Sequence, residues 1–191
     1  GTDYSFEVVQ SPEIEFFNPE GSTVRPIEDE RFELEACTDV QLNFLARQVE
    51  SVIIRASDGT IVWDSGPGIP RTIDSTSLAS PLNFGDLRND TTFTIEASNL
   101  CGTITSDISL MVYHAIHMES EPRVRTGGSL NINIRISCPA TAGGVEINFA
   151  TSLPGVFDFP PDPIIIPEGE TRATHTIDAL MNCVETTLTA N

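Results

Sequence analysis

The sequence contains no lysine: all ten of its basic residues are arginines. Schiff-base chemistry and lysine–asparagine cross-links are therefore excluded. Against 28 Asp and Glu residues, the ten arginines leave a formal net charge of −18. Nucleic acids and anionic membranes bind clustered Lys and Arg, and a surface of this charge repels both. The composition is typical of an acidic protein kept in solution by charge repulsion, and we expect no nucleic-acid partner.

Long apolar runs and catalytic motifs are also missing. No stretch approaches the roughly 18 apolar residues of a membrane-spanning helix, so we expect no membrane insertion. The nucleophile elbow, the zinc-binding H-E-x-x-H pattern and the glycine-rich phosphate loop are all absent. His114 and His117 form a close pair, but positions i and i+3 of a strand face opposite sides, which argues against shared metal ligation. The sequence predicts no enzyme activity, no catalytic residue and no metal ligand.

Cysteine is scarce and evenly divided. Two cysteines lie in each half of the chain: Cys37 and Cys101, then Cys138 and Cys183. No C-x-x-C spacing for redox work or zinc occurs. An even count with one pair per half predicts two structural disulfides and an oxidising compartment, which places the protein outside the cell or on its surface. On the chain-entropy model, loops of this size stabilise each half by roughly 4 kcal/mol.

Alternation of apolar and polar residues dominates the rest of the sequence. Short segments rich in Val, Ile, Phe and Thr are separated by Gly, Pro, Asn and Asp clusters, as in residues 31–36, 40–46, 51–57, 130–137 and 144–151. This pattern is typical of short antiparallel strands, and the Asp-Gly pair within residues 57–60 predicts a hairpin turn. No segment sustains a 3.6-residue period. The predicted fold class is all-β, with β-sandwiches.

The strand pattern stops and restarts once, around residues 114–128. We therefore predict a first sandwich over residues 30–113 and a second over residues 114–191. Residues 1–29 are predicted to form an extended N-terminal strand followed by a linker.

Residues 31–113 resemble the immunoglobulin-like and PKD-like repeats of bacterial surface proteins. The resemblance rests on Cys37, on Trp63 in a central hairpin and on the segment 87–102. It implies a Cys37–Cys101 bridge. The second half resembles another extracellular β-sandwich repeat through residues 127–137 and 139–171. Such repeats serve many roles, so the resemblance implies the fold rather than an activity.

The second predicted sandwich lacks a counterpart of the last strand of the first. Residues 91–98 are followed in the first sandwich by a returning strand over 106–118, whereas the matching segment 184–190 has no such successor in the sequence. Residues 2–14 align with residues 106–118 without a gap. The N-terminal segment therefore has the pattern of a final strand whose own sandwich is absent.

Strand exchange between copies connects these two observations. A neighbouring copy could insert residues 3–9 beside the 184–190 strand, as in donor-strand complementation. The donor side chains facing inward are Tyr4, Phe6 and Val8, and the acceptor edge is formed by Val184, Thr186, Leu188 and Ala190. Burying three such donor side chains contributes roughly 5–8 kcal/mol before ordering costs. Because the contact joins unlike surfaces, it propagates as an open filament unless it closes a ring.

Two other interpretations remain open. The sequence is equally consistent with a spacer fragment of a large adhesin, cut from a tandem array of sandwiches. A carbohydrate-binding accessory domain is the rival from another class, but its usual platform of exposed aromatics is represented only by Tyr4, Trp63 and Tyr113, and Trp63 is expected to face the core. Asn89–Thr91 is a glycosylation sequon that also fits ordinary turn chemistry.

Calcium is the one cofactor that the sequence suggests. Acidic residues are concentrated in residues 27–33 and 158–163, and loops of this kind often hold Ca²⁺ in extracellular sandwiches. No D-x-D-x-D-G pattern occurs, which favours a solvated acidic surface over a calcium site. We therefore expect no bound cofactor and, as partners, other copies of the same chain.

Overall fold

The computed structural model describes residues 10–28, 30–69, 71–85, 87–120, 123–159, 163–180 and 186–190. The chain divides into two compact units, Gly1–Tyr113 (unit 1) and His114–Asn191 (unit 2). Strands and turns make up both units, apart from one short 3-10 helix at Ser75–Ser77 in unit 1. The predicted all-β class is confirmed. No helix in the described part of the chain is long and apolar enough to cross a membrane.

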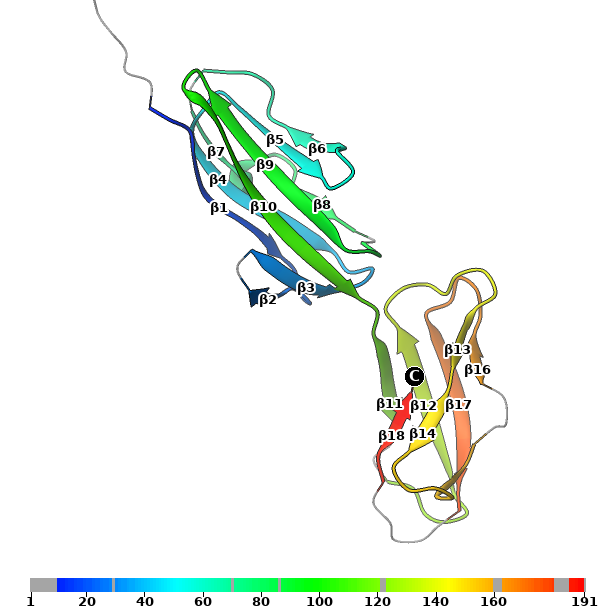
Figure 1. Ribbon diagram of the computed structural model, residues 1–191. Coiled ribbons are helices and arrows are strands. Elements are labelled where there is room, and N and C mark those ends of the chain that lie inside the picture. The colour runs from blue at the N-terminus through cyan, green and yellow to red at the C-terminus, as the bar shows by residue number, and fades with distance from the viewer. Residues whose placement is uncertain are drawn as a thin grey trace, which may run out of the picture. The chain divides into compact units, whose positions relative to one another are not determined.

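Unit 1 consists of two sheets (Figure 1). The first sheet has the order β1-β4-β7, with β8 also paired to β4; its strands are β1 (Glu13–Glu20), β4 (Val40–Val49), β7 (Arg71–Asp74) and β8 (Asn83–Phe84). The second has the order β2-β3-β10-β9-β5-β6; its strands are β2 (Arg25–Glu28), β3 (Arg31–Glu35), β5 (Ser51–Ala56), β6 (Ile61–Asp64), β9 (Thr91–Asn99) and β10 (Gly102–Tyr113). All pairings are antiparallel except that of β3 with β10.

The core of unit 1 lies between these sheets. Alternate residues of β4 point inward from the first sheet, and Phe44 is fully buried among them. From the second sheet, Ile54, Ile95 and Ile108 are buried against the same core. The alternation of apolar and polar residues in the sequence therefore matches the alternation of buried and exposed side chains, because successive side chains of a strand face opposite sides of the sheet.

Ser75 supplies a buried hydrogen bond in this core. Its hydroxyl oxygen accepts from the backbone N–H of Phe44 at 2.8 Å, and Ser75 is only 3% exposed. We expect Ser75→Ala to lower the free energy of unfolding of unit 1 by about 1–3 kcal/mol, because the buried N–H of Phe44 loses its acceptor. Denaturant unfolding followed by the fluorescence of Trp63, the single tryptophan, measures this loss in unit 1.

Ser77→Ala is the matched control for this variant. The Ser77 hydroxyl donates to the carbonyl of Asp74 at an exposed position. Its removal should change the free energy of unfolding by no more than about 0.5 kcal/mol. Equal losses in the two variants would contradict the role assigned to the Ser75 hydroxyl.

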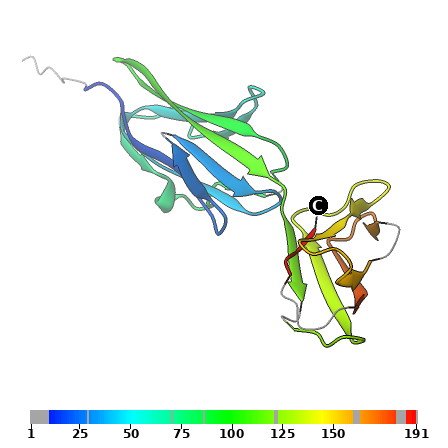
Figure 2. The ribbon, with the colours of Figure 1, turned by 60° about the horizontal axis from the view of Figure 1, so that its bottom comes forward.

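Unit 2 has fewer strands, arranged as one four-stranded sheet and two two-stranded sheets (Figures 1 and 2). One sheet has the order β11-β12-β17-β15, formed by β11 (Ile116–Ser120), β12 (Ser129–Ile136), β17 (Arg172–Ala179) and β15 (Phe157–Asp158). Opposite it lie the pairs β13–β16 and β14–β18, formed by β13 (Val145–Ile147), β14 (Phe149–Thr151), β16 (Ile164–Ile166) and β18 (Leu188–Ala190). Isoleucines from both layers, including Ile132, Ile147, Ile166 and Ile177, form the core.

The strand pairings of the two units correspond. The antiparallel pairs β1–β4 and β4–β7 of unit 1 match β11–β12 and β12–β17 of unit 2. Only Asn148 separates β13 from β14, so together they take the place of β5; the pairs β5–β6 and β5–β9 then match β13–β16 and β14–β18. By this correspondence, β18 occupies the position in unit 2 that β9 occupies in unit 1. The described part of unit 2 has no counterpart of β10.

The segment predicted as a linker is part of unit 1. Residues 13–20 form β1, which pairs with β4, and residues 25–28 form β2, which pairs with β3. Phe17 on β1 is 5% exposed and belongs to the core. Glu15 precedes Phe16, and Asn18 and Pro19 follow Phe17. This mixed pattern hid a strand with only one deeply buried aromatic side chain.

The expected Cys37–Cys101 bridge is wrong. Cys37 follows β3, which runs parallel to the Tyr113 end of β10, whereas Cys101 precedes the opposite end of β10 at Gly102. Eleven residue steps along β10 correspond to about 36 Å, and a disulfide needs Cα atoms within about 7 Å. Cys37 and Cys138 are disulfide-bonded, whereas Cys101 is exposed and keeps its thiol. Cys183 lies outside the described residues.

Candidate strand-acceptor site

The candidate site is the edge of β18 that does not face β14. Thr189 pairs with Ala150, and Leu188 with Thr151, in an antiparallel register. Hydrogen bonds continue this pairing upstream of β18: the backbone N–H of Ser152 donates to the carbonyl of Thr187 at 3.0 Å. Among the described residues, β14 is the single strand paired with β18. A row of backbone donors and acceptors on the other edge is therefore available to a further strand.

Side chains on β18 alternate as an acceptor strand requires. Thr186, Leu188 and Ala190 are half-buried, whereas Thr187 and Thr189 are exposed. Leu188 and Ala190 pack against the core of unit 2. The predicted acceptor residue Val184 lies outside the described residues.

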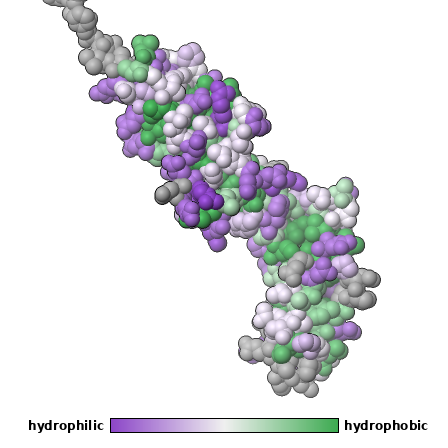
Figure 3. Space-filling model, in the orientation of Figure 1, coloured by the Kyte–Doolittle hydropathy of each residue, from purple (hydrophilic) through white to green (hydrophobic). Residues whose placement is uncertain are grey.

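The matching strand of unit 1 shows what a covered edge looks like. The inward residues of β9 are Phe93, Ile95 and Ala97, and each is at most 2% exposed. Strand β9 has β5 on one side and β10 on the other. The inward side chains of β18 remain only half-buried because no described strand occupies the position of β10. The surface of unit 2 shows hydrophobic side chains in the view of Figure 3.

Strand β10 also indicates which side of a donor strand faces the core. The predicted donor residues Tyr4, Phe6 and Val8 align with Ile108, Leu110 and Val112. Ile108 and Leu110 are each 1% exposed, and Val112 packs against the core. These three positions therefore all point inward in β10. Residues 3–9 themselves lie outside the described residues.

The attachment point of residues 3–9 lies at one end of unit 1. The side-chain amide of Asn99 donates to the carbonyl of Gln10 at 2.7 Å. Asn99 pairs with Gly102 at the start of β10, about 36 Å from Tyr113, where the chain leaves the unit.

Other residues singled out in the sequence do not form a site. The Trp63 ring packs on Phe44 with centroids 5.4 Å apart and contacts the core of unit 1, so it does not form a carbohydrate platform. In the described part of the chain, no group of three or more His, Cys, Asp or Glu residues could hold a metal ion. Parts of the two acidic loops, residue 29 and residues 160–162, lie outside that region.

Two turn carboxylates are electrostatically perturbed. The pKa of Asp74 lies below its ordinary value because its carboxylate accepts hydrogen bonds from the backbone N–H and the hydroxyl of Thr76. The pKa of Asp58 is lowered in the same way by Thr60. Both groups fix turns of unit 1, whereas β18 belongs to unit 2.

Comparison with known proteins gives no relative: no family model matches the chain, and no curated protein shows significant similarity to it.

Proposed function

We propose that this chain is a structural subunit of an extracellular filament or surface fibre, and that its copies join head to tail by strand addition. Residues 3–9 of one copy add beside β18 of the next, with Tyr4, Phe6 and Val8 directed into the core of unit 2. This proposal rests on one difference between the two units. Strand β9 lies between two strands, whereas β18 pairs with β14 alone among the described residues.

Energetics favour an occupied edge. An added strand converts half-buried positions such as Leu188 into buried ones and supplies three apolar side chains of its own. Their burial contributes roughly 5–8 kcal/mol, from which association and ordering costs are subtracted. The donor and the acceptor are different surfaces, so repetition of the contact produces an open fibre rather than a closed dimer.

The environment of a surface fibre agrees with the covalent chemistry of the chain. Cys37 and Cys138 are disulfide-bonded, and such bonds persist in oxidising compartments. The net charge of −18 limits non-specific association between fibres. Both properties fit a protein that is secreted or displayed at the cell surface.

A spacer within a longer array of sandwiches is the second candidate. Residues 106–118 run from β10 through His114 and Ala115 into β11, the first strand of the next unit. Residues 2–14 have the same pattern and lead directly into β1, the first strand of unit 1. This correspondence favours a chain in which the last strand of one sandwich continues into the next, with the strand beside β18 supplied in cis.

Self-association distinguishes the two candidates. For the filament, we expect the mass measured by sedimentation to grow with protein concentration, and Phe6→Asp to abolish that growth because a charge cannot enter the core. Ser5→Asp introduces the same charge at the alternate, outward position and should leave assembly intact. A chain that stays monomeric at every concentration would contradict the filament. It would favour the spacer, in which the strand beside β18 comes from the same chain.

A further inference from the structure

The outer face of the β11–β12–β17 sheet carries a second feature, independent of strand addition. Three successive outward pairs between β12 and β17 are complementary and hydrogen-bonded. The pairs are Ser129–Asp178 at 2.7 Å, Asn131–Thr176 at 2.8 Å and Asn133–Thr174 at 2.9 Å. Polar residues that match across strands in this way stabilise the sheet.

The next outward pair is not complementary, because Arg135 lies directly opposite Arg172. Like charges at such positions destabilise a sheet. Acidic residues outnumber arginines 28 to 10 in the sequence, yet no ion pair within the described residues involves either arginine. On the other side of Arg135, His117 of β11 occupies the same level. Three nitrogen-bearing side chains thus form one row across three strands, here called the arginine row.

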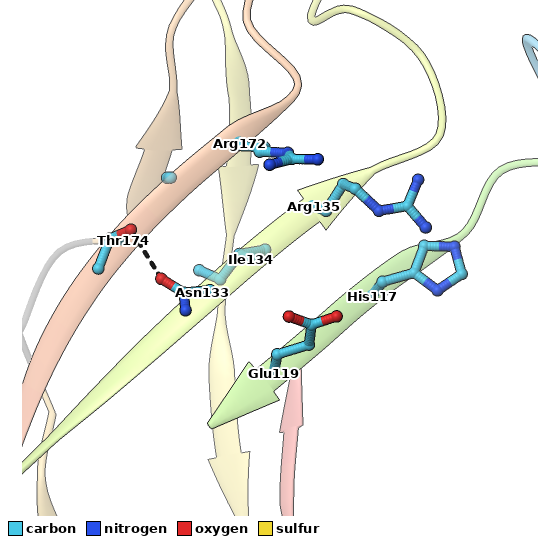
Figure 4. Close-up of a pocket in the computed structure, with 8 residues that line it drawn as sticks. His117, Glu119, Asn133, Ile134, Arg135, Arg172 and Thr174 are labelled. Atoms are coloured by element: carbon cyan, nitrogen blue, oxygen red, sulfur yellow. Dashed lines mark hydrogen bonds between the residues drawn. The ribbon is translucent and has the colours of Figure 1, made fainter. Parts of the chain in front are cut away.

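A shallow hollow of about 330 Å³ lies over the arginine row. Figure 4 shows Arg135, Arg172 and His117 along one side of this hollow, with Glu119 and the hydrogen-bonded pair of Asn133 and Thr174 along the other. One side therefore offers guanidinium groups, and the other offers neutral donors and acceptors together with one carboxylate.

We propose that the arginine row binds the carboxylate or sulfate group of an acidic saccharide. Guanidinium forks match planar oxyanions in bidentate geometry, so a bound anion offsets the repulsion between Arg135 and Arg172. Sugar hydroxyls are both donors and acceptors, and they fit Glu119, Asn133 and Thr174 on the other side of the hollow. Nucleic acid fits the site poorly, because a polyphosphate needs an extended basic surface, whereas this chain offers two adjacent arginines in an acidic molecule.

The test is a calorimetric titration of the full chain with trigalacturonate, neutral trigalactose, sodium sulfate and single-stranded DNA at equal ionic strength. We expect saturable binding of trigalacturonate, with binding of trigalactose weaker by about tenfold or more, because the charge-assisted hydrogen bonds are lost. Arg135→Gln and Arg172→Gln should each weaken trigalacturonate binding by a similar factor. Arg125→Gln, an exposed substitution before the far end of β12, should leave binding unchanged.

Thermal unfolding of the unliganded variants supplies a second readout. Removal of one like charge should raise the unfolding temperature of Arg135→Gln at low salt, and trigalacturonate should raise that of the unmodified chain more than that of the variant. Absence of saturable trigalacturonate binding, or binding by both row variants as tight as that of the unmodified chain, would overturn the site. Sulfate or single-stranded DNA binding as tightly as trigalacturonate would overturn the saccharide assignment.

Discussion

Appending residues 2–12 after Asn191 through a short flexible linker should raise the unfolding temperature of unit 2 by ~8–16 °C. The appended strand can occupy the edge of β18 that does not face β14 within the same molecule, so no association cost is paid. The gross burial by Tyr4, Phe6 and Val8 is about 5–8 kcal/mol, and strand ordering cancels most of it. A net gain of about 2 kcal/mol corresponds to the stated shift for a domain of this size. Differential scanning calorimetry measures it.

Two control variants test whether the stabilisation depends on the inward side chains of the appended copy. Phe6→Asp within the appended copy should remove the stabilisation, whereas Ser5→Asp at the adjacent outward position should preserve most of it. In both controls the N-terminal residues 2–12 are deleted, so that the appended copy is the sole donor. An extended chain that unfolds at the same temperature as the unextended one would contradict strand acceptance at β18.

Phe44→Ala should lower the free energy of unfolding of unit 1 by about 3–5 kcal/mol. Phe44 is fully buried at the centre of the first sheet and contacts Trp63, so truncation leaves a cavity between the two sheets. A loss of this size is a large part of the stability of an ordinary domain. Denaturant unfolding, followed by far-UV circular dichroism and by Trp63 fluorescence, measures it.

Phe16→Ala is the matched control, since it removes the same atoms from a residue of β1 that is 36% exposed. We expect a loss within about 1 kcal/mol, because a surface substitution creates no enclosed cavity. If the two variants lost stability equally, the assignment of β4 to the centre of the core would be wrong.

Burial patterns explain how much of the fold could be predicted. Alternation in segments such as 40–46 and 130–137 identified strands β4 and β12, because one face of each is completely apolar. Strands β1 and β2 were missed, since β1 buries only Phe17 and Pro19 and β2 is exposed throughout. Edge strands carry weak periodicity because they contribute few side chains to a core.

The disulfide error has a different origin. Cys37 and Cys101 fall in one unit, and the resemblance that implied their bridge took no account of the direction of β10 in this sheet. The parallel pairing of β3 with β10 is a long-range property of the sheet, and no local pattern encodes it. Strand order, not cysteine count, decides which thiols can meet.

The two candidate sites also differ in how much of each could be predicted from the sequence. Inward alternation at Thr186, Leu188 and Ala190 was readable from the sequence, and the structure adds that β18 pairs with β14. The arginine row was invisible, because residues 117, 135 and 172 are far apart in the chain and meet only through strand register. A scarcity of basic residues was the one signal that could have drawn attention to them.

Strand acceptance at β18 is tested most directly by titrating the ¹⁵N-labelled chain, lacking residues 1–12, with a synthetic peptide of residues 2–12. Deletion ends before β1 begins at Glu13, so unit 1 keeps all of its described strands. We expect saturable amide shifts centred on Leu188–Ala190 and on its partner strand Phe149–Thr151, together with slowed hydrogen exchange at β18. No shift at β18, or shifts confined to other strand edges such as β2 or β6, would contradict it.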